Sequence, residues 1–149
     1  MRRRLAKSDL MRFPKETYWS WLPVVKEKEL IKPGGVLDLF SEEKDGWLYY
    51  VRLVSTNPDI EVNIDVFADR MIEISETIRS LKEAGYAASQ LGFRILTYDD
   101  FNSIYSVEYA PGMGGFPGVP FRGKNRAYLV NKGNVDAYVW FTGWLIEVK

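Results

Sequence analysis

Two segments of the chain contain residues that could bind a phosphate group or a metal ion, and the first is a glycine-rich run. Residues Gly118 to Lys124 (GVPFRGK) match the GxxxxGK spacing of the phosphate-binding P-loop. That loop surrounds phosphate with consecutive backbone amides and leads into a helix, with a hydroxyl group placed on magnesium. Here Pro120 removes one amide, Asn125 stands where Ser or Thr is needed, and the residues that follow are typical of a strand. We therefore expect no nucleotide site and no cofactor.

The second segment is an acidic turn between two strand-like runs. Asp99, Asp100 and Asn102, with Glu108 on the returning run, offer oxygen atoms of the kind that bind calcium. A hairpin turn whose Asp and Asn bond their own backbone explains the same residues, and we favour it because no loop of calcium-binding spacing surrounds them. The carboxylates could also serve a small hydrolase, although nothing sets two of them at a defined separation. We expect neither a metal site nor a catalytic residue.

The composition narrows the chemistry further. The 149-residue chain contains no His and no Cys, which removes the usual general base, the commonest ligand for transition metals, and all thiol chemistry. Apolar residues make up 46% of the chain and aromatic residues 15%, so a core can form without metal or disulfide. We predict that the protein is not an enzyme.

The aromatic residues indicate contact surfaces. Tryptophans in β-prone runs could bind sugars through their flat ring faces. We favour packing in a core or between subunits, because residues 47–55 and 135–148 are largely apolar on both sides of each predicted strand. The tryptophans concerned are Trp19, Trp21, Trp47, Trp140 and Trp144.

A long loop is predicted over residues 110–123 (APGMGGFPGVPFRG), which carry no charge before Arg122. Apolar side chains on such a loop either meet a partner or fold back over the end of the protein's own core. Both alternatives remain open at this point. The candidate interface consists of Met113, Phe116, Val119 and Phe121.

The charge of the chain is unevenly distributed. The formal net charge is zero, yet residues 1–15 hold six basic residues against one acidic residue. We predict a basic arm over residues 1–17, followed by a single β-sandwich domain over residues 18–149. Nucleic acid would bind only through this arm, whose candidate contacts with an anionic partner are Arg2, Arg3, Arg4 and Lys7. No apolar run has the pattern of a signal peptide or the length of a membrane span.

Short β-prone runs separated by turn residues make up most of the chain. Residues 60–66 alternate apolar and polar side chains, which is the period of a strand with one buried face. Residues 47–55 suit a central strand, and residues 93–98 and 104–109 suit a hairpin. Residues 18–25, interrupted by Pro23, suit an edge strand or an extended arm.

One short α-helix is predicted near residues 75–84. Ser75 is the expected N-cap, Ile78 and Leu81 lie three apart on one face, and Gly85 follows the last turn. Many strands with a single helix predict an all-β protein, an antiparallel β-sandwich of jelly-roll-like type.

The order of strands and turns resembles that of a family of viral proteins. The chain carries, in order, GWLYYVRLVSTNPDIEVNIDV, a short helical insert that ends near Gly85, TYDDFNSIYSVEYAPG and PFRGKNRAYLVN. Over about residues 46–148 this order resembles small jelly-roll-like structural proteins of tailed phages and archaeal viruses.

The resemblance implies a virion structural protein, namely a capsid, decoration or tail component, with no active-site residues. Such a protein would be assembled in the host cytoplasm and reside in the virion. Its partners would be copies of itself and other virion proteins. A carbohydrate-binding β-sandwich module is the alternative, and a small carboxylate-dependent hydrolase is the third interpretation.

Overall fold

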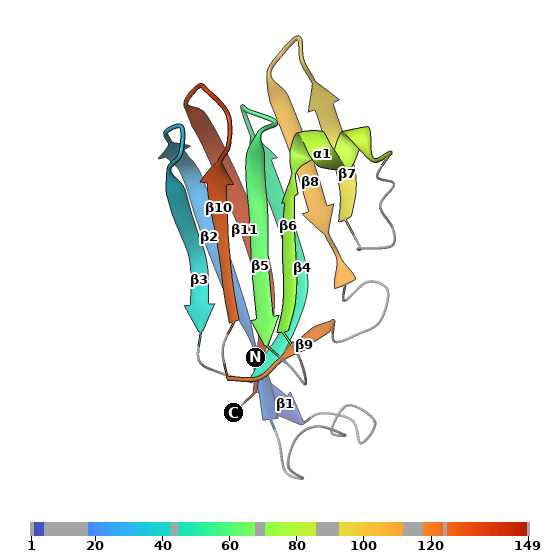
Figure 1. Cartoon of the computed structure of the whole chain (residues 1–149). Helices are drawn as coiled ribbons and strands as arrows, with labels where there is room; N and C mark the ends of the chain where they lie inside the picture. The colour runs from blue at the N-terminus through green and yellow to red at the C-terminus, as the bar shows by residue number, and fades with distance from the viewer. Residues whose placement is uncertain are drawn as a thin grey trace.

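The computed structural model describes residues 2–4, 18–42, 45–67, 71–85, 93–111, 118–123 and 125–148, which form a two-layer β-sandwich (Figure 1). The seven-stranded sheet contains β1 (Arg2–Arg4), β2 (Tyr18–Ile31), β4 (Gly46–Ser55), β7 (Phe93–Asp99), β8 (Ile104–Tyr109), β9 (Val119–Phe121) and β11 (Ala137–Val148). The four-stranded sheet contains β3 (Val36–Glu42), β5 (Ile60–Phe67), β6 (Met71–Thr77) and β10 (Asn125–Asn131). A helix, α1 (Ile78–Glu83), connects the smaller sheet to the larger one.

The strands pair in the nested order of a jelly roll. β2 pairs with β11, β3 with β10, β4 with β8, and β5 with β6, and all four pairs are antiparallel. A long hairpin paired in this way and wrapped into two sheets gives the spatial orders β2-β11-β4-β8 and β3-β10-β5-β6, which are the orders observed. The predicted antiparallel β-sandwich of jelly-roll-like type is therefore confirmed.

Two separate strands, β8 and β9, pair with the same side of β4. β8 pairs with residues 51–55 of β4 and β9 pairs with residues 46–48, so the chain leaves the sheet after Tyr109 and returns beside the same strand. Gly118 permits this return, because its φ is +112° and a Cβ there would lie 2.2 Å from the carbonyl oxygen of Leu48. The predicted long loop thus ends in a strand.

The core fills the space between the two sheets. Alternate side chains of each strand point into this space, and the predicted apolar side of residues 60–66 is there: Ile60, Val62 and Ile64 are at most 1% exposed. Leu53 of β4 and Phe141 of β11 meet them from the larger sheet and are also fully buried.

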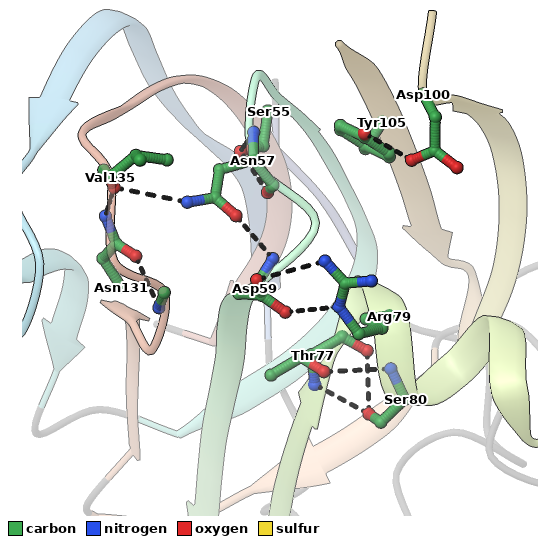
Figure 2. Close-up of polar contacts among 11 residues, drawn as sticks. Ser55, Asn57, Asp59, Thr77, Arg79, Ser80, Asp100, Tyr105, Asn131 and Val135 are labelled. Atoms are coloured by element: carbon green, nitrogen blue, oxygen red, sulfur yellow. Dashed lines mark hydrogen bonds and ion pairs between the residues drawn. The ribbon is translucent and has the colours of Figure 1, made fainter.

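Buried asparagines hold the connections between the sheets at one end of the sandwich (Figure 2). The Nδ2 atom of Asn57 donates to the carbonyl oxygen of Val135 at 3.3 Å. The Nδ2 atom of Asn131 donates to the same oxygen at 2.8 Å and to that of Ile31 at 2.9 Å, while its Oδ1 accepts from the amide of Gly133 at 2.9 Å. Because these amides are bonded, they fix the connecting turns at little desolvation cost.

Helix α1 covers part of the core with the predicted face. Ile78 and Leu81 are 0% and 2% exposed, and Gly85 follows the helix with a φ of +74°. Arg79, on the opposite face, forms a two-atom ion pair with Asp59 at 2.7 and 3.2 Å (Figure 2). Within the described ranges, no helix has the length and apolar character needed to cross a membrane.

The helix begins later than predicted, which corrects the expected N-cap. Ser75 lies in β6, a strand that was not predicted and that pairs with β5 along its whole length. The N-cap is Thr77, whose Oγ1 accepts from the amide of Ser80 at 2.9 Å, while the Oγ of Ser80 accepts from the amide of Thr77 at 3.0 Å. This reciprocal pair is a capping box built from two hydroxyl groups.

Part of the predicted basic arm is joined to the larger sheet. Arg2–Arg4 form β1, which lies in antiparallel register with Tyr18–Ser20 of β2. Lys7 lies outside the described residues. Residues 2–4 of the predicted arm therefore pair with the first strand of the predicted domain.

We predict that Gly46→Ala strongly destabilises the protein. A Cβ at residue 46 would lie 2.0 Å from the carbonyl oxygen of Ile146 and 3.0 Å from Cζ of Phe121, so the backbone of β11 would have to move. Overpacking of this kind should lower the free energy of unfolding by about 3 kcal/mol or more. Urea unfolding followed by circular dichroism measures the change.

Gly85→Ala is the matched control. No described residue lies within 4 Å of a Cβ at residue 85, so the change expected from this variant is a left-handed backbone strain, at a φ of +74°. Such strain costs about 1–2 kcal/mol. If the two variants lost equal amounts of unfolding free energy, the close approach of β4 and β11 at Gly46 would be contradicted.

Candidate binding face

The acidic turn of the β7–β8 hairpin is occupied by its own hydrogen bonds. Asp99 Oδ1 accepts from the amides of Phe101 and Asn102, each at 3.0 Å, and Asp99 Oδ2 accepts from Asn102 Nδ2 at 2.7 Å. The bonds from Asn102, its side chain first, hold the pKa of Asp99 below its ordinary value. The Tyr105 hydroxyl donates to Asp100 Oδ1 at 2.7 Å (Figure 2). The structure thus confirms the predicted hairpin turn.

Glu108, the fourth candidate oxygen ligand, is held away from that turn. Its Oε2 accepts from the hydroxyl of Tyr50 at 2.9 Å, and its Oε1 accepts from Arg94. Among the residues that the structure describes, no group of three or more acidic side chains is placed to hold a metal ion. Asp99, Asp100 and Glu108 therefore all accept hydrogen bonds from other residues of the protein.

The structure places two of the four candidate interface residues in β9. Phe121 is 2% exposed and belongs to the core, and Val119 packs against that core. Phe121 is therefore not available as an interface residue, because pairing of β9 with β4 turns its ring inward. For Phe121 this agrees with the alternative that the loop closes over its own core. β9 leads into β10 rather than into a helix, which differs from a P-loop. Met113 and Phe116 lie outside the described residues.

The outer face of the larger sheet, which points away from the other sheet, carries most of the described tryptophans. Trp47 is 5% exposed and packs with Ile146 in a small second cluster. Trp140 and Trp144 are each 38% exposed. The expected burial on both sides thus holds for Trp47 within this chain, whereas Trp140 and Trp144 remain accessible.

A bulge in β4 adds a tyrosine to this face. Trp144 pairs with Tyr50 and the next residue of β11 pairs with Leu48, so Tyr49 is the extra residue. Leu48 and Val51 point into the core, and the two tyrosines between them both lie on the outer face. The sequence gives little sign of Tyr49 as a site residue, because the two consecutive tyrosines in LYYV are the local interruption of the alternation.

Three aromatic rings line an open hollow of about 370 Å³ on this face. They belong to Trp21 of β2, Tyr49 of β4 and Trp144 of β11. The ring of Trp21 meets that of Tyr49 at a centroid distance of 5.1 Å and an angle of 80°, and that of Trp144 at 6.1 Å and 88°. The rings thus form walls at nearly right angles, which suits a ligand with flat apolar faces.

Polar side chains of β4 lie beside Trp144, one of the three residues that line the hollow. Tyr50 is the Cα partner of Trp144 and donates its hydroxyl to Glu108. Burial and this bond raise the pKa of Tyr50. Arg52, two residues along β4, is exposed and has no ion-pair partner among the described residues. Arg52 was not singled out from the sequence, since only the strand register brings it near Trp144.

A second apolar area, here called the apolar strip, lies farther along the same face. Val25 and Leu30 of β2 are 55% and 43% exposed, and Tyr138 and Trp140 of β11 are 41% and 38% exposed. Tyr138 pairs with Leu30, and the Nζ atom of Lys28 lies 5.7 Å from the centre of the Tyr138 ring. These four apolar residues define the strip.

No protein-family model matches this chain, and no curated protein matches its sequence. The functional interpretation therefore depends on the fold and on the outer face of the larger sheet.

We predict that Tyr105 makes stability fall in strongly alkaline solution. The bond from its hydroxyl to Asp100, together with burial, raises the pKa of Tyr105 to about 12. Because the unfolded side chain titrates near pH ~10, the folded state holds this proton more tightly. The stabilisation is present below about pH 10 and is lost as the pH rises toward about 12.

Urea midpoints of the wild type and of Tyr105→Phe, measured across this pH range, test the effect. The difference between the two proteins should shrink as the pH rises, because the variant lacks the hydroxyl. A difference that stays constant from pH ~9 to ~12 would mean that the proton is not held by Asp100.

Proposed function

We propose that the protein is a non-enzymatic structural component of a virus particle, such as a capsid, decoration or tail protein. It associates with copies of itself or with other virion proteins through the apolar strip. The observation that carries the proposal is the joint exposure of Val25, Leu30, Tyr138 and Trp140 on neighbouring strands. The wet face of an antiparallel sheet is normally polar, and grouped apolar side chains on a surface normally meet a partner.

The strand order and the state of the carboxylates support the same proposal. The jelly-roll order is used by viral capsid domains and also by lectin domains, so it agrees with a binding role without selecting one. Asp59 pairs with Arg79, Asp38 pairs with Arg126, and Glu108 is bonded as described above. Carboxylates held in such pairs support a non-enzymatic role, because acid–base catalysis needs a group that can approach substrate.

A second copy of the chain is the partner that the strip favours. Lys26, Glu27, Lys28 and Glu29 alternate in charge along β2 at the border of the strip. In a two-fold contact the same surface meets itself in reverse order, so lysines of one copy can lie opposite glutamates of the other. Such a border is self-complementary and adds specificity to the apolar contact. The arginines of β1 are the proposed contact with nucleic acid or another anionic virion component.

We expect the protein to form oligomers whose dissociation constant rises when the strip is changed. Replacing Tyr138 and Trp140 together by Ser should weaken association at least about thirtyfold, because one buried aromatic anchor is worth about 2 kcal/mol or more. Analytical ultracentrifugation over a range of concentrations measures this, and circular dichroism checks that the β spectrum is kept.

Phe101→Ser is the control variant. Phe101 is 94% exposed but lies in the turn between β7 and β8, at the other edge of the sheet from β2. Its loss should leave association unchanged. A wild-type protein that stays monomeric at every concentration would contradict self-association, and a double variant that associates normally would remove the strip as the contact.

A further inference from the structure

We propose that the hollow lined by Trp21, Tyr49 and Trp144 binds a pyranose sugar that carries a carboxylate, and that Arg52 binds this carboxylate. The proposal is independent of the viral role, since it concerns a different part of the outer face from the apolar strip. It would apply equally to a carbohydrate-binding module.

The size and walls of the hollow favour a sugar. Small-molecule sites have volumes of roughly 300–1,000 Å³, and this hollow of about 370 Å³ lies near the lower limit, where one or two sugar rings fit. A pyranose ring has C–H groups on its faces and hydroxyl groups around its rim. Its faces therefore pack on aromatic rings while its rim stays hydrated.

The angle between the rings adds to this preference. The planes of Tyr49 and Trp144 are each nearly perpendicular to that of Trp21. One wall can therefore take the face of a sugar ring while another meets its edge. Trp144, which is 38% exposed, offers accessible ring surface to such a ligand.

Arg52 gives the site its preference for charge. It pairs with Thr142, which lies two residues before Trp144 on β11, so Arg52 is a diagonal neighbour of Trp144 on the same face. Diagonal neighbours lie about 7–8 Å apart, within reach of a long side chain. A guanidinium group forms two parallel hydrogen bonds with a carboxylate, which makes an acidic sugar the matching ligand.

The carboxylate that lies opposite Arg52 on the neighbouring strand bonds to other residues. Glu108 lies opposite Arg52 on β8, but its two oxygens accept bonds from Tyr50 and Arg94. Arg52 and Arg94 thus face one glutamate, which leaves one positive charge in excess within this group of three side chains. This excess favours an anionic ligand over a neutral one.

Isothermal titration calorimetry of the full chain with two matched sugars tests the proposal by measuring the dissociation constant of each. The probes are an oligosaccharide of hexuronic acid units and the same oligosaccharide after reduction of its carboxyl groups to neutral hydroxymethyl groups. The acidic form should bind at least about tenfold more tightly, which corresponds to a hydrogen bond to a charged group. Arg52→Gln should remove this difference, and Trp144→Ala should weaken both sugars by about tenfold.

Trp140→Ala is the matched control. Trp140 lies on the same strand and is as exposed as Trp144, at 38%, but it does not line the hollow. It should leave sugar binding unchanged while weakening self-association, so failure of either proposal can be distinguished from failure of the other. Absence of binding by the folded wild type, or unchanged binding by Trp144→Ala, would overturn the site. Equal binding of both sugars by wild type and Arg52→Gln would overturn the role of Arg52.

Discussion

The packing of the two sheets against each other is the constraint on which the rest of the structure depends. Side chains alternate along a strand, so burying Val139 and Phe141 of β11 in the core commits Trp140 to the outer face. Gly143 serves the same packing, because a Cβ there would lie 3.0 Å from Cε1 of Phe141. The aromatic outer face therefore follows from the demands of the inner one, apart from the bulge that brings Tyr49 to the outside.

The sequence predicts what is decided locally and misses what is decided by pairing. Residues 60–66 alternate strictly, and the burial of Ile60, Val62 and Ile64 follows from that alternation. Asn63, on the polar side of β5, is buried as well at 4% exposure, because β6 brings Ser75 against it. The bulge at Tyr49 depends on the register with β11, and the burial of Phe121 depends on where β9 returns to β4. The helix cap shows the same limit. Ser75 and Thr77 are both suitable caps, and the length of the pairing between β5 and β6 selects Thr77.

The edge of β2 and its outer face differ in character: the edge hinders strand pairing, whereas the face is apolar. Beyond the part that pairs with β1, no described strand pairs with the outer edge of β2. This stretch carries Pro23, which lacks an amide hydrogen, and Lys28, whose φ of +47° interrupts regular pairing. Charged residues follow in alternation. These features hinder edge-to-edge growth of the sheet, whereas the outer face of the same strand is apolar at Val25 and Leu30. The face of the sheet is therefore the surface better suited to a specific contact.

β8 and β9 both pair with β4, and the chain between them can change in length while these two pairings are kept. β8 and β9 pair with β4 on either side of residues 49–50, so the segment between Pro111 and Gly118 connects two strands that share one partner. Doubling the length of a closed loop costs only about 0.6 kcal/mol in chain entropy. New sequence inserted there would join two strands whose pairing with β4 flanks Tyr49. The protein thus has a frame on which recognition could be diversified by exchanging one segment, in the way that antibodies exchange loops on a constant scaffold.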